Sequence, residues 1–174
     1  MIKLFSTFIH PVPADYEEWL EKLAQKGYHP KKIKQLSSLY LNFEKGEPKK
    51  YRYVLDIQPF IKKEYFETYK DFGWEFCGQM ASTYLWRMEY TDERPESFTD
   101  YSALKERNKR FLKATSFSFI LLLLIFLIIA VYFILNINSF GLQDKIQFSV
   151  WLALTGLISV YLGFVMLKIN KHNK

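Results

Sequence analysis

Apolar and polar residues recur with two different periods in the first ninety residues of the chain. Residues 15–26 and 62–72 place apolar side chains at helical spacing, and Gly27 and Gly73 follow as helix stops. Asp15 is the expected N-cap of the first helix. Six other segments alternate in the manner of strands with two unlike faces: 2–9, 28–35, 39–44, 50–57, 74–79 and 82–90. The pattern predicts the order strand, helix, strand, strand, twice in succession.

The two halves of this region correspond to each other at spacings of 48 and 46 residues. Ile9 and Pro11 match Ile57 and Pro59 at the larger spacing. Gly27-Tyr28 and Gly73-Trp74 are 46 residues apart, as are Leu39-Tyr40 and Leu85-Trp86. A duplicated unit predicts this correspondence, and two small motifs that became similar independently would also produce it. In both cases we expect an α+β domain with one six-stranded, largely antiparallel sheet and two helices on one face.

Two long uncharged segments lie near the C-terminal end. Residues 114–135 and 146–167 contain no charged side chain, and each is long enough to cross roughly 30 Å of hydrocarbon as a helix. Two buried core helices are the alternative, but such helices rarely contain uncharged runs of this length. We therefore expect a two-helix transmembrane hairpin with spans at 114–135 and 148–167.

The net charge of +6 is confined to the flanks of these spans. Residues 1–98 contain fifteen basic and fifteen acidic side chains, so the domain itself is neutral. The excess lies at Lys105, Arg107, Lys109, Arg110, Lys113, Lys168, Lys171 and Lys174. Because basic residues favour the cytoplasmic side, both termini are expected to be cytoplasmic. The charge thus indicates membrane orientation and contact with the lipid bilayer rather than a nucleic-acid partner.

These patterns divide the chain into seven parts. We expect a cytoplasmic α+β domain, a polar linker, a basic juxtamembrane helix, the first span, an extracytoplasmic loop, the second span and a basic cytoplasmic tail. No cleavable signal is expected before the domain, because its first apolar stretch is too short. The boundaries are 1–91, 92–102, 103–113, 114–135, 136–147, 148–167 and 168–174.

Residues suited to catalysis or metal binding are few. His10, His29 and His172 are not at metal-ligand spacing, and the single Cys77 excludes an internal disulfide or a cysteine-based metal site. The sequence contains no nucleophile elbow, phosphate loop or dinucleotide fingerprint. The acidic pair Glu17-Glu18 is explained by the first turn of a helix. We expect no enzyme, no metal and no cofactor.

Aromatic residues are the excess of the domain. A small domain uses large rings to bury enough surface, but some rings could instead line a surface for a partner or an apolar ligand. The mixed-charge turn 44–48 reads as a solvated hairpin or as a docking surface. The candidate residues are Trp19, Tyr28, Trp74 and Trp86 among the rings, and Glu44, Glu47 and Arg52 in and after the turn.

The second span carries small residues at four-residue spacing: Thr155, Ser159 and Gly163. Such a stripe lets another helix approach closely. It could pack on the first span near Thr115 and Ser118, or on a second copy or another membrane partner. The spans contain no ionisable side chain, which argues against a transporter or channel.

Three blocks resemble a bacterial family of unknown function numbered twenty-eight twelve. They are Tyr-Glu-Glu-Trp-Leu-Glu-Lys-Leu-Ala at 16–24, Phe-Glu-Lys-Gly-Glu-Pro-Lys-Lys-Tyr-Arg-Tyr at 43–53 and Asp-Phe-Gly-Trp-Glu at 71–75. The resemblance covers about residues 3–92, with Gly27-Tyr28-His29 where the family usually reads Gly-Trp-His. It implies small proteins of Firmicutes-type bacteria, often with C-terminal spans and often encoded beside PadR-type regulators. It implies no activity.

The sequence therefore favours a membrane-tethered, non-enzymatic regulatory or adaptor domain that presents an aromatic-rich surface to a protein partner. The expected location is the bacterial cell membrane. The alternative is a sensor that binds apolar small molecules in a cleft between the two repeats. The alternative rests on a fold-level similarity of the tandem unit to effector-binding domains of the GyrI type.

Overall fold

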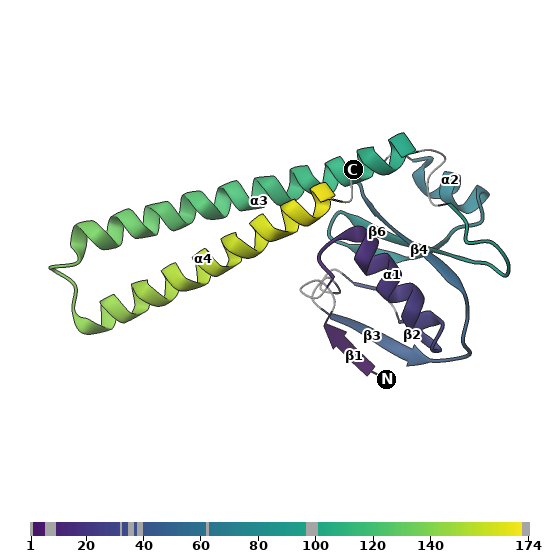
Figure 1. Cartoon of the computed structure of the whole chain (residues 1–174), viewed down its shortest axis with the longest axis horizontal. Coiled ribbons are helices and arrows are strands. Elements are labelled where there is room, and N and C mark those ends of the chain that lie inside the picture. Colours follow the sequence, from purple (N-terminus) through teal and green to yellow (C-terminus); the bar gives the residue numbers. More distant parts are fainter. Residues whose placement is uncertain are drawn as a thin grey trace. The chain divides into compact units, whose positions relative to one another are not determined.

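A computed structural model of the chain describes residues 2–5, 10–31, 33–34, 37, 40–61, 63–96 and 101–171. The chain forms two compact units, Met1–Arg107 and Asn108–Lys174. Figure 1 shows the elements in chain order. They are β1 (Ile2–Phe5), α1 (Pro13–Ala24), β2 (Tyr28–Pro30), β3 (Tyr40–Lys45), β4 (Tyr51–Ile57), α2 (Tyr65–Asp71), β5 (Glu75–Met80), β6 (Thr83–Glu89), α3 (Tyr101–Asn136) and α4 (Leu142–Lys171).

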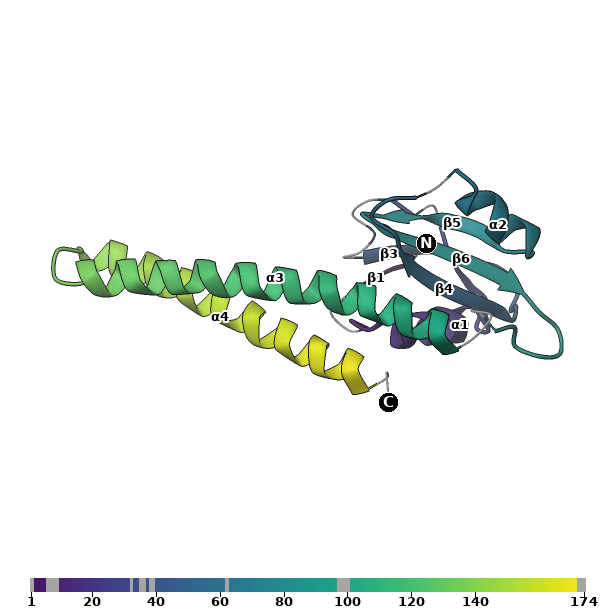
Figure 2. The same ribbon diagram turned by 90° about the horizontal axis from the view of Figure 1, so that it is seen from above.

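The first unit contains two antiparallel sheets with the same internal order. The strands of one sheet run β1-β3-β2, and those of the other run β4-β6-β5, as Figure 2 shows for the second sheet. The α+β class and the repeated strand-helix-strand-strand order are thus confirmed, while a common origin of the two halves stays a prediction. The single six-stranded sheet was wrong. Residues 46–50 connect the two sheets, so they do not form the predicted hairpin.

In the described part of the chain, one isolated parallel β-bridge joins the two halves at Ile33 and Gly78. The register of β5 against β6 shifts between Phe76 and Gly78, and Gly78 has a φ of +144°. A Cβ atom at Gly78 would lie 2.6 Å from the Cβ of Ile33. Only glycine fits this conformation and approach, because any other side chain would force the two segments apart. Among the described residues, β-pairing between the two sheets is therefore limited to this bridge.

α1 begins earlier than the sequence predicts. Pro13 occupies its first turn, where a missing N–H costs nothing, and Val12 is the N-cap. Asp15 lies inside the first turn, so its assignment as N-cap was wrong. After the helix Gly27 adopts a φ of +78°, and its carbonyl accepts a hydrogen bond from the N–H of Gly46 at 2.8 Å. Gly27 ends the helix as predicted.

α2 is shorter than the predicted span of 62–72. None of its seven described residues is buried, but Tyr65, Phe66 and Tyr69 are half-buried and pack on the core of the second sheet. Phe72, the last apolar residue of the predicted helix, is 66% exposed. A helix this short gains little from its own hydrogen bonds, so its position depends on these three rings.

The second unit contains two helices that are long and apolar enough to cross a membrane. In their most apolar windows none of α3 and 17% of α4 is buried, which is unlike core helices of a soluble domain. α3 runs without interruption from the basic segment into the first apolar run, as predicted. α4 begins at Leu142, so the connection is shorter than the predicted 136–147.

The small residues of α4 accommodate rings of α3. A Cβ at Gly163 would lie 3.9 Å from the ring of Phe119, and one at Gly156 would lie 3.5 Å from the ring of Phe126. Thr155 and Ser159 are buried. Within the chain the stripe thus packs against α3, with Phe119 beside Gly163 and Phe126 beside Gly156. A homodimer through this helix stays a prediction.

Candidate functional site

α1 lies against β4, the strand at one edge of the second sheet. The N–H of Leu55 donates to Oε1 of Glu17 at 2.9 Å, and the N–H of Tyr53 donates to Oε1 of Glu21 at 3.3 Å. Residues four apart on a helix are separated by about 6 Å, and residues two apart on a strand by about 6.8 Å. Because these two spacings nearly match, the carboxylates of Glu17 and Glu21 can accept hydrogen bonds from two successive N–H groups on the unpaired side of β4. The edge of the sheet is thereby closed.

Three arginines surround these two carboxylates. Arg52, 5% exposed, donates to Glu17 at 3.3 Å and to Glu21 at 2.8 Å. Arg107, 1% exposed, donates to Glu17. Arg94 donates two hydrogen bonds to the carboxylate of Glu21, at 3.0 and 3.1 Å. We call these five residues the buried charge network; Arg94 lies at its edge, with 48% of its side chain exposed. Each buried carboxylate has at least two cationic donors, the condition under which buried charges are tolerated.

Through Arg94, which follows β6, and Arg107, near the start of α3, the network extends the folded domain beyond β6. Arg94 and Arg107 come from parts of the chain that we expected to be a linker and a juxtamembrane helix. The compact unit ends at Arg107, beyond the predicted boundary at residue 91. One sequence signal was available: the spacing of Glu17 and Glu21 places them on the same face of α1 as the buried residues Leu20 and Ala24.

The opposite part of the second sheet carries a group of aromatic rings beneath α2. Trp86 of β6 is fully buried, and Tyr69 stacks on it with ring centroids 4.3 Å apart and planes 9° apart. Phe66 and Phe76 contact the same indole at 5.7 and 5.1 Å. We call this group the aromatic cluster; it comprises Tyr65, Phe66, Tyr69, Trp74, Phe76, Tyr84 and Trp86.

A buried carboxylate fixes α2 over this cluster. Asp56 of β4 is 2% exposed and accepts hydrogen bonds from the hydroxyls of Tyr65 at 3.1 Å and Tyr69 at 3.4 Å. The Nε1–H of Trp86 in turn donates to the Tyr65 hydroxyl at 3.1 Å. Burial, reinforced by the charge of Asp56, raises the pKa of Tyr65. Its hydroxyl therefore keeps its proton and remains a donor to Asp56.

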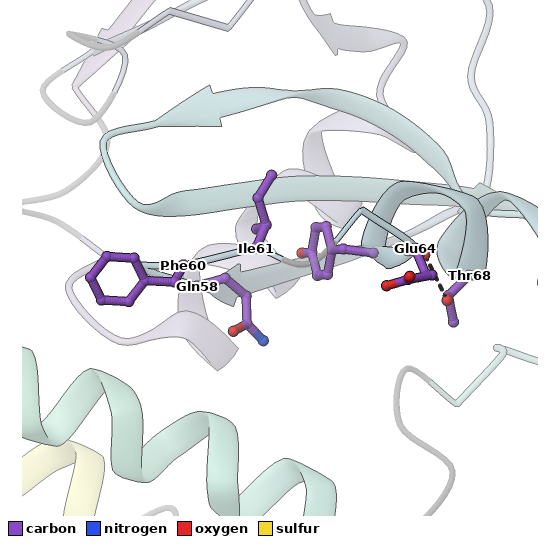
Figure 3. Close-up of a pocket in the computed structure, with 6 residues that line it drawn as sticks. Gln58, Phe60, Ile61, Glu64 and Thr68 are labelled. Atoms are coloured by element: carbon purple, nitrogen blue, oxygen red, sulfur yellow. Dashed lines mark hydrogen bonds between the residues drawn. The ribbon is translucent and has the colours of Figure 1, made fainter.

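A pocket of about 300 Å³ opens beside the N-terminal end of α2 (Figure 3). Phe60 extends away from Glu64 and Thr68, which mark the helical end of the pocket. Phe60 is 91% exposed, and Ile61, Phe72 and Phe76 are also exposed. We call these four apolar residues the α2 rim. The pocket is lined by Gln58, Phe60, Ile61, Glu64, Tyr65 and Thr68.

The residues that the sequence proposed as a surface lie in different parts of the structure. Trp74 and Trp86 are 7% and 0% exposed, so they form the base of the aromatic cluster and present no surface. Arg52 was expected beside a solvated turn, but it is buried in the charge network. Trp19 is half-buried, and its ring stacks on His10 with centroids 4.9 Å apart.

Three other proposed residues do come together at the end of β2 and β3. Tyr28 is half-buried in β2, next to His29, which pairs with Glu44. The His29 ring is hydrogen-bonded to the carbonyl of Glu47 at 2.8 Å. Among the described residues, no group of three His, Cys, Asp or Glu side chains could hold a metal ion. This end of the sheet therefore combines charged side chains with Tyr28 and with the His29 ring, which packs edge-on against Tyr51 at a centroid distance of 5.7 Å.

Comparison with known proteins identifies the family of the chain. A family model described as Protein of unknown function (DUF2812) matches residues 13–120. The chain belongs to this family. The resemblance found in the sequence is thereby confirmed, and the matched DUF2812 range contains the buried charge network, the aromatic cluster and the start of the first span. No curated protein matches the chain, and no solved structure does.

Proposed function

We propose that this DUF2812 protein is a membrane-tethered, non-enzymatic regulatory or adaptor protein whose α2 rim receives a protein partner. The observation that carries the proposal is the exposure of four large apolar side chains around one short helix. Exposed apolar groups gathered in one place are typical of recognition surfaces. The aromatic cluster supplies what such a surface needs, a rigid base held by stacked rings and by the hydroxyl bonds to Asp56.

A small-molecule sensor is the second candidate, and its site differs from the one the sequence suggested. At Ile33 and Gly78 the two halves touch through their backbones. The pocket described here lies instead within the second half, between the β4–α2 connection and α2. Its volume of about 300 Å³ is at the lower end for ligand sites. Its apolar wall at Phe60 and Ile61 would suit a small apolar ligand.

Both termini are proposed to be cytoplasmic in the bacterial cell membrane, since the basic residues flank the two spans. A cysteine at Ser139, between the helices, is expected to label with an impermeant thiol reagent in intact cells. A cysteine at Lys105 is expected to label only after lysis. Native Cys77 is replaced by serine, although burial already raises its pKa to about 12 and slows its reaction. The reverse pattern of labelling would overturn the orientation.

The partner surface is tested by placing a photo-crosslinking amino acid at Phe60 or Phe72 of the full chain in native membranes. Lys26, exposed in the first half, is the matched control position. We expect one discrete protein adduct from both rim positions and none from Lys26, because Phe60 and Phe72 are exposed apolar side chains and Lys26 is a charged one. The adduct is identified by mass spectrometry. The adduct formed at Phe60 must be lost in Phe72→Ser, and the adduct formed at Phe72 must be lost in Phe60→Ser.

The same experiment separates the other occupants of the rim. Adducts that contain only lipid would assign the rim to the membrane surface and overturn the partner proposal. A small-molecule adduct that disappears in Thr68→Trp, a change that fills the pocket, would favour the sensor. Equal labelling at Lys26 and at the rim would show that the exposed rings recognise nothing in particular.

A further inference from the structure

One carboxylate oxygen connects the start of α3 to the second sheet. Arg107, in the second turn of α3, donates to Oε1 of Glu17, and the backbone N–H of Leu55 donates to the same oxygen at 2.9 Å. Arg52 donates to the other oxygen of Glu17 at 3.3 Å. A shift of Arg107 therefore removes a donor from the oxygen that accepts the N–H of Leu55 and closes the edge of β4.

On β4, the residue that is bonded to Glu17 is next to the residue that is bonded to α2. Asp56 follows Leu55 directly and accepts the hydroxyl bonds of Tyr65 and Tyr69 from α2. Val54, which precedes Leu55, is fully buried and belongs to the core that packs against the rings of α2. Displacing the backbone at Leu55 would thus disturb both the hydroxyl bonds and the packing that hold α2 in place.

α2 is the element best suited to respond. None of its seven described residues is buried, so half-buried rings and two hydroxyl bonds fix its position. Elements held by few buried contacts open at a lower free energy than the surrounding core. By contrast, Arg107 and Glu17 are 1% and 3% exposed, so the contact between them is buried.

We propose that the buried charge network couples the first turns of α3 to the α2 rim through β4. The connected groups are Arg107, Oε1 of Glu17, the N–H of Leu55, Asp56 and the hydroxyls of Tyr65 and Tyr69. Since α3 continues into the apolar span, a movement of the membrane helix at Arg107 regulates how firmly α2 is held. The regulatory meaning rests on the proposed function of the rim, whereas the coupling itself is a property of the chain alone.

The coupling is tested by hydrogen exchange of the full chain in lipid nanodiscs. Arg107→Gln is expected to speed exchange about tenfold in peptides covering 51–57 and 65–71, because Glu17 loses a donor at the oxygen shared with Leu55. Lys105→Gln, an exposed position on the same helix, is the control and should leave both peptides unchanged. Arg94→Gln should affect the 51–57 peptide alone, since Arg94 contacts Glu21 and not Glu17.

The reverse experiment decides the matter, because coupling between two sites acts equally in both directions. Tyr65→Phe removes one donor to Asp56 and is expected to speed exchange at Leu55 and in residues 103–107. If it affects only α2, the proposal is overturned. If Arg107→Gln instead unfolds the domain, exchange also rises in β1 and β3. In that case the exchange measured in Tyr65→Phe and Arg107→Lys tests the coupling. These measurements need no partner, so their failure would leave the crosslinking result at the rim untouched.

Discussion

Glu17→Gln is expected to lower the free energy of unfolding of the domain by about 3–5 kcal/mol, the usual cost of leaving a buried charge without its partner. Glu17 is 3% exposed and accepts hydrogen bonds from Arg52, Arg107 and the N–H of Leu55. Glutamine has nearly the same shape, so packing is preserved. The amide keeps one acceptor oxygen but removes the charge and turns an N–H group toward the two guanidinium groups.

Glu18→Gln is the matched control for this prediction. Glu18 is the next residue of the same helix, but its side chain is 61% exposed and pairs with Lys22 at 2.7 Å. Exposed pairs of this kind contribute about 0–1 kcal/mol, so the control should change stability by less than about 0.5 kcal/mol. Urea unfolding of the full chain in detergent micelles, followed by tryptophan fluorescence, measures both variants. A loss below about 1 kcal/mol in Glu17→Gln would show that the network does not stabilise the domain.

The contrast between these neighbouring glutamates also shows where prediction from the sequence ends. The sequence placed both in the first turn of the helix, where a helix dipole would explain them equally well, whereas in the structure α1 begins at Pro13 and both lie in its second turn. What distinguishes Glu17 is its partners, Arg52 and Arg107, which are 35 and 90 residues away in the sequence. Pairing at that distance depends on the completed fold, so the helical period can place Glu17 and Glu21 on the buried face of α1 but does not reveal their partners.

Local structure was predicted more successfully, for a physical reason. Side-chain period and helix stops at Gly27 and Gly73 depend only on neighbouring residues, and both glycines do adopt positive φ, at +78° and +83°. The division into two sheets depends instead on the close contact of Ile33 with Gly78. The sequence contains the glycine, but nothing near it indicates which segment of the other half it will meet.

The aromatic residues show the same division between composition and placement. Their number predicted correctly that rings dominate the domain, but it did not separate Trp86, which is fully buried, from Phe60, which is 91% exposed. Trp86 lies in the middle strand of its sheet, whereas Phe60 lies in the connection before a short helix. The candidate surface therefore moved from the tryptophans to the phenylalanines around α2.

Trp86→Ala is the second change for which we expect a large loss, about 3–5 kcal/mol of unfolding free energy. The indole is fully buried, stacks on Tyr69 and donates its Nε1–H to the Tyr65 hydroxyl at 3.1 Å. Alanine would leave a cavity in the middle of the sheet, because neighbouring rings are held in place by Asp56 and cannot close it. α2 would lose the surface on which it rests.

Two further variants separate the parts of this loss. Trp86→Phe keeps a ring but removes the donor to Tyr65, and it should cost about 1–2 kcal/mol, typical of a lost hydrogen bond with slight repacking. Trp19→Ala, at a half-buried indole that stacks on His10, should also cost about 1–2 kcal/mol. The same urea transitions measure all three variants, with near-ultraviolet circular dichroism reporting the packing of the aromatic cluster. A loss at Trp86→Ala no greater than at Trp19→Ala would mean that the aromatic cluster is not the base of the α2 rim, and the partner surface proposed on it would lose its support.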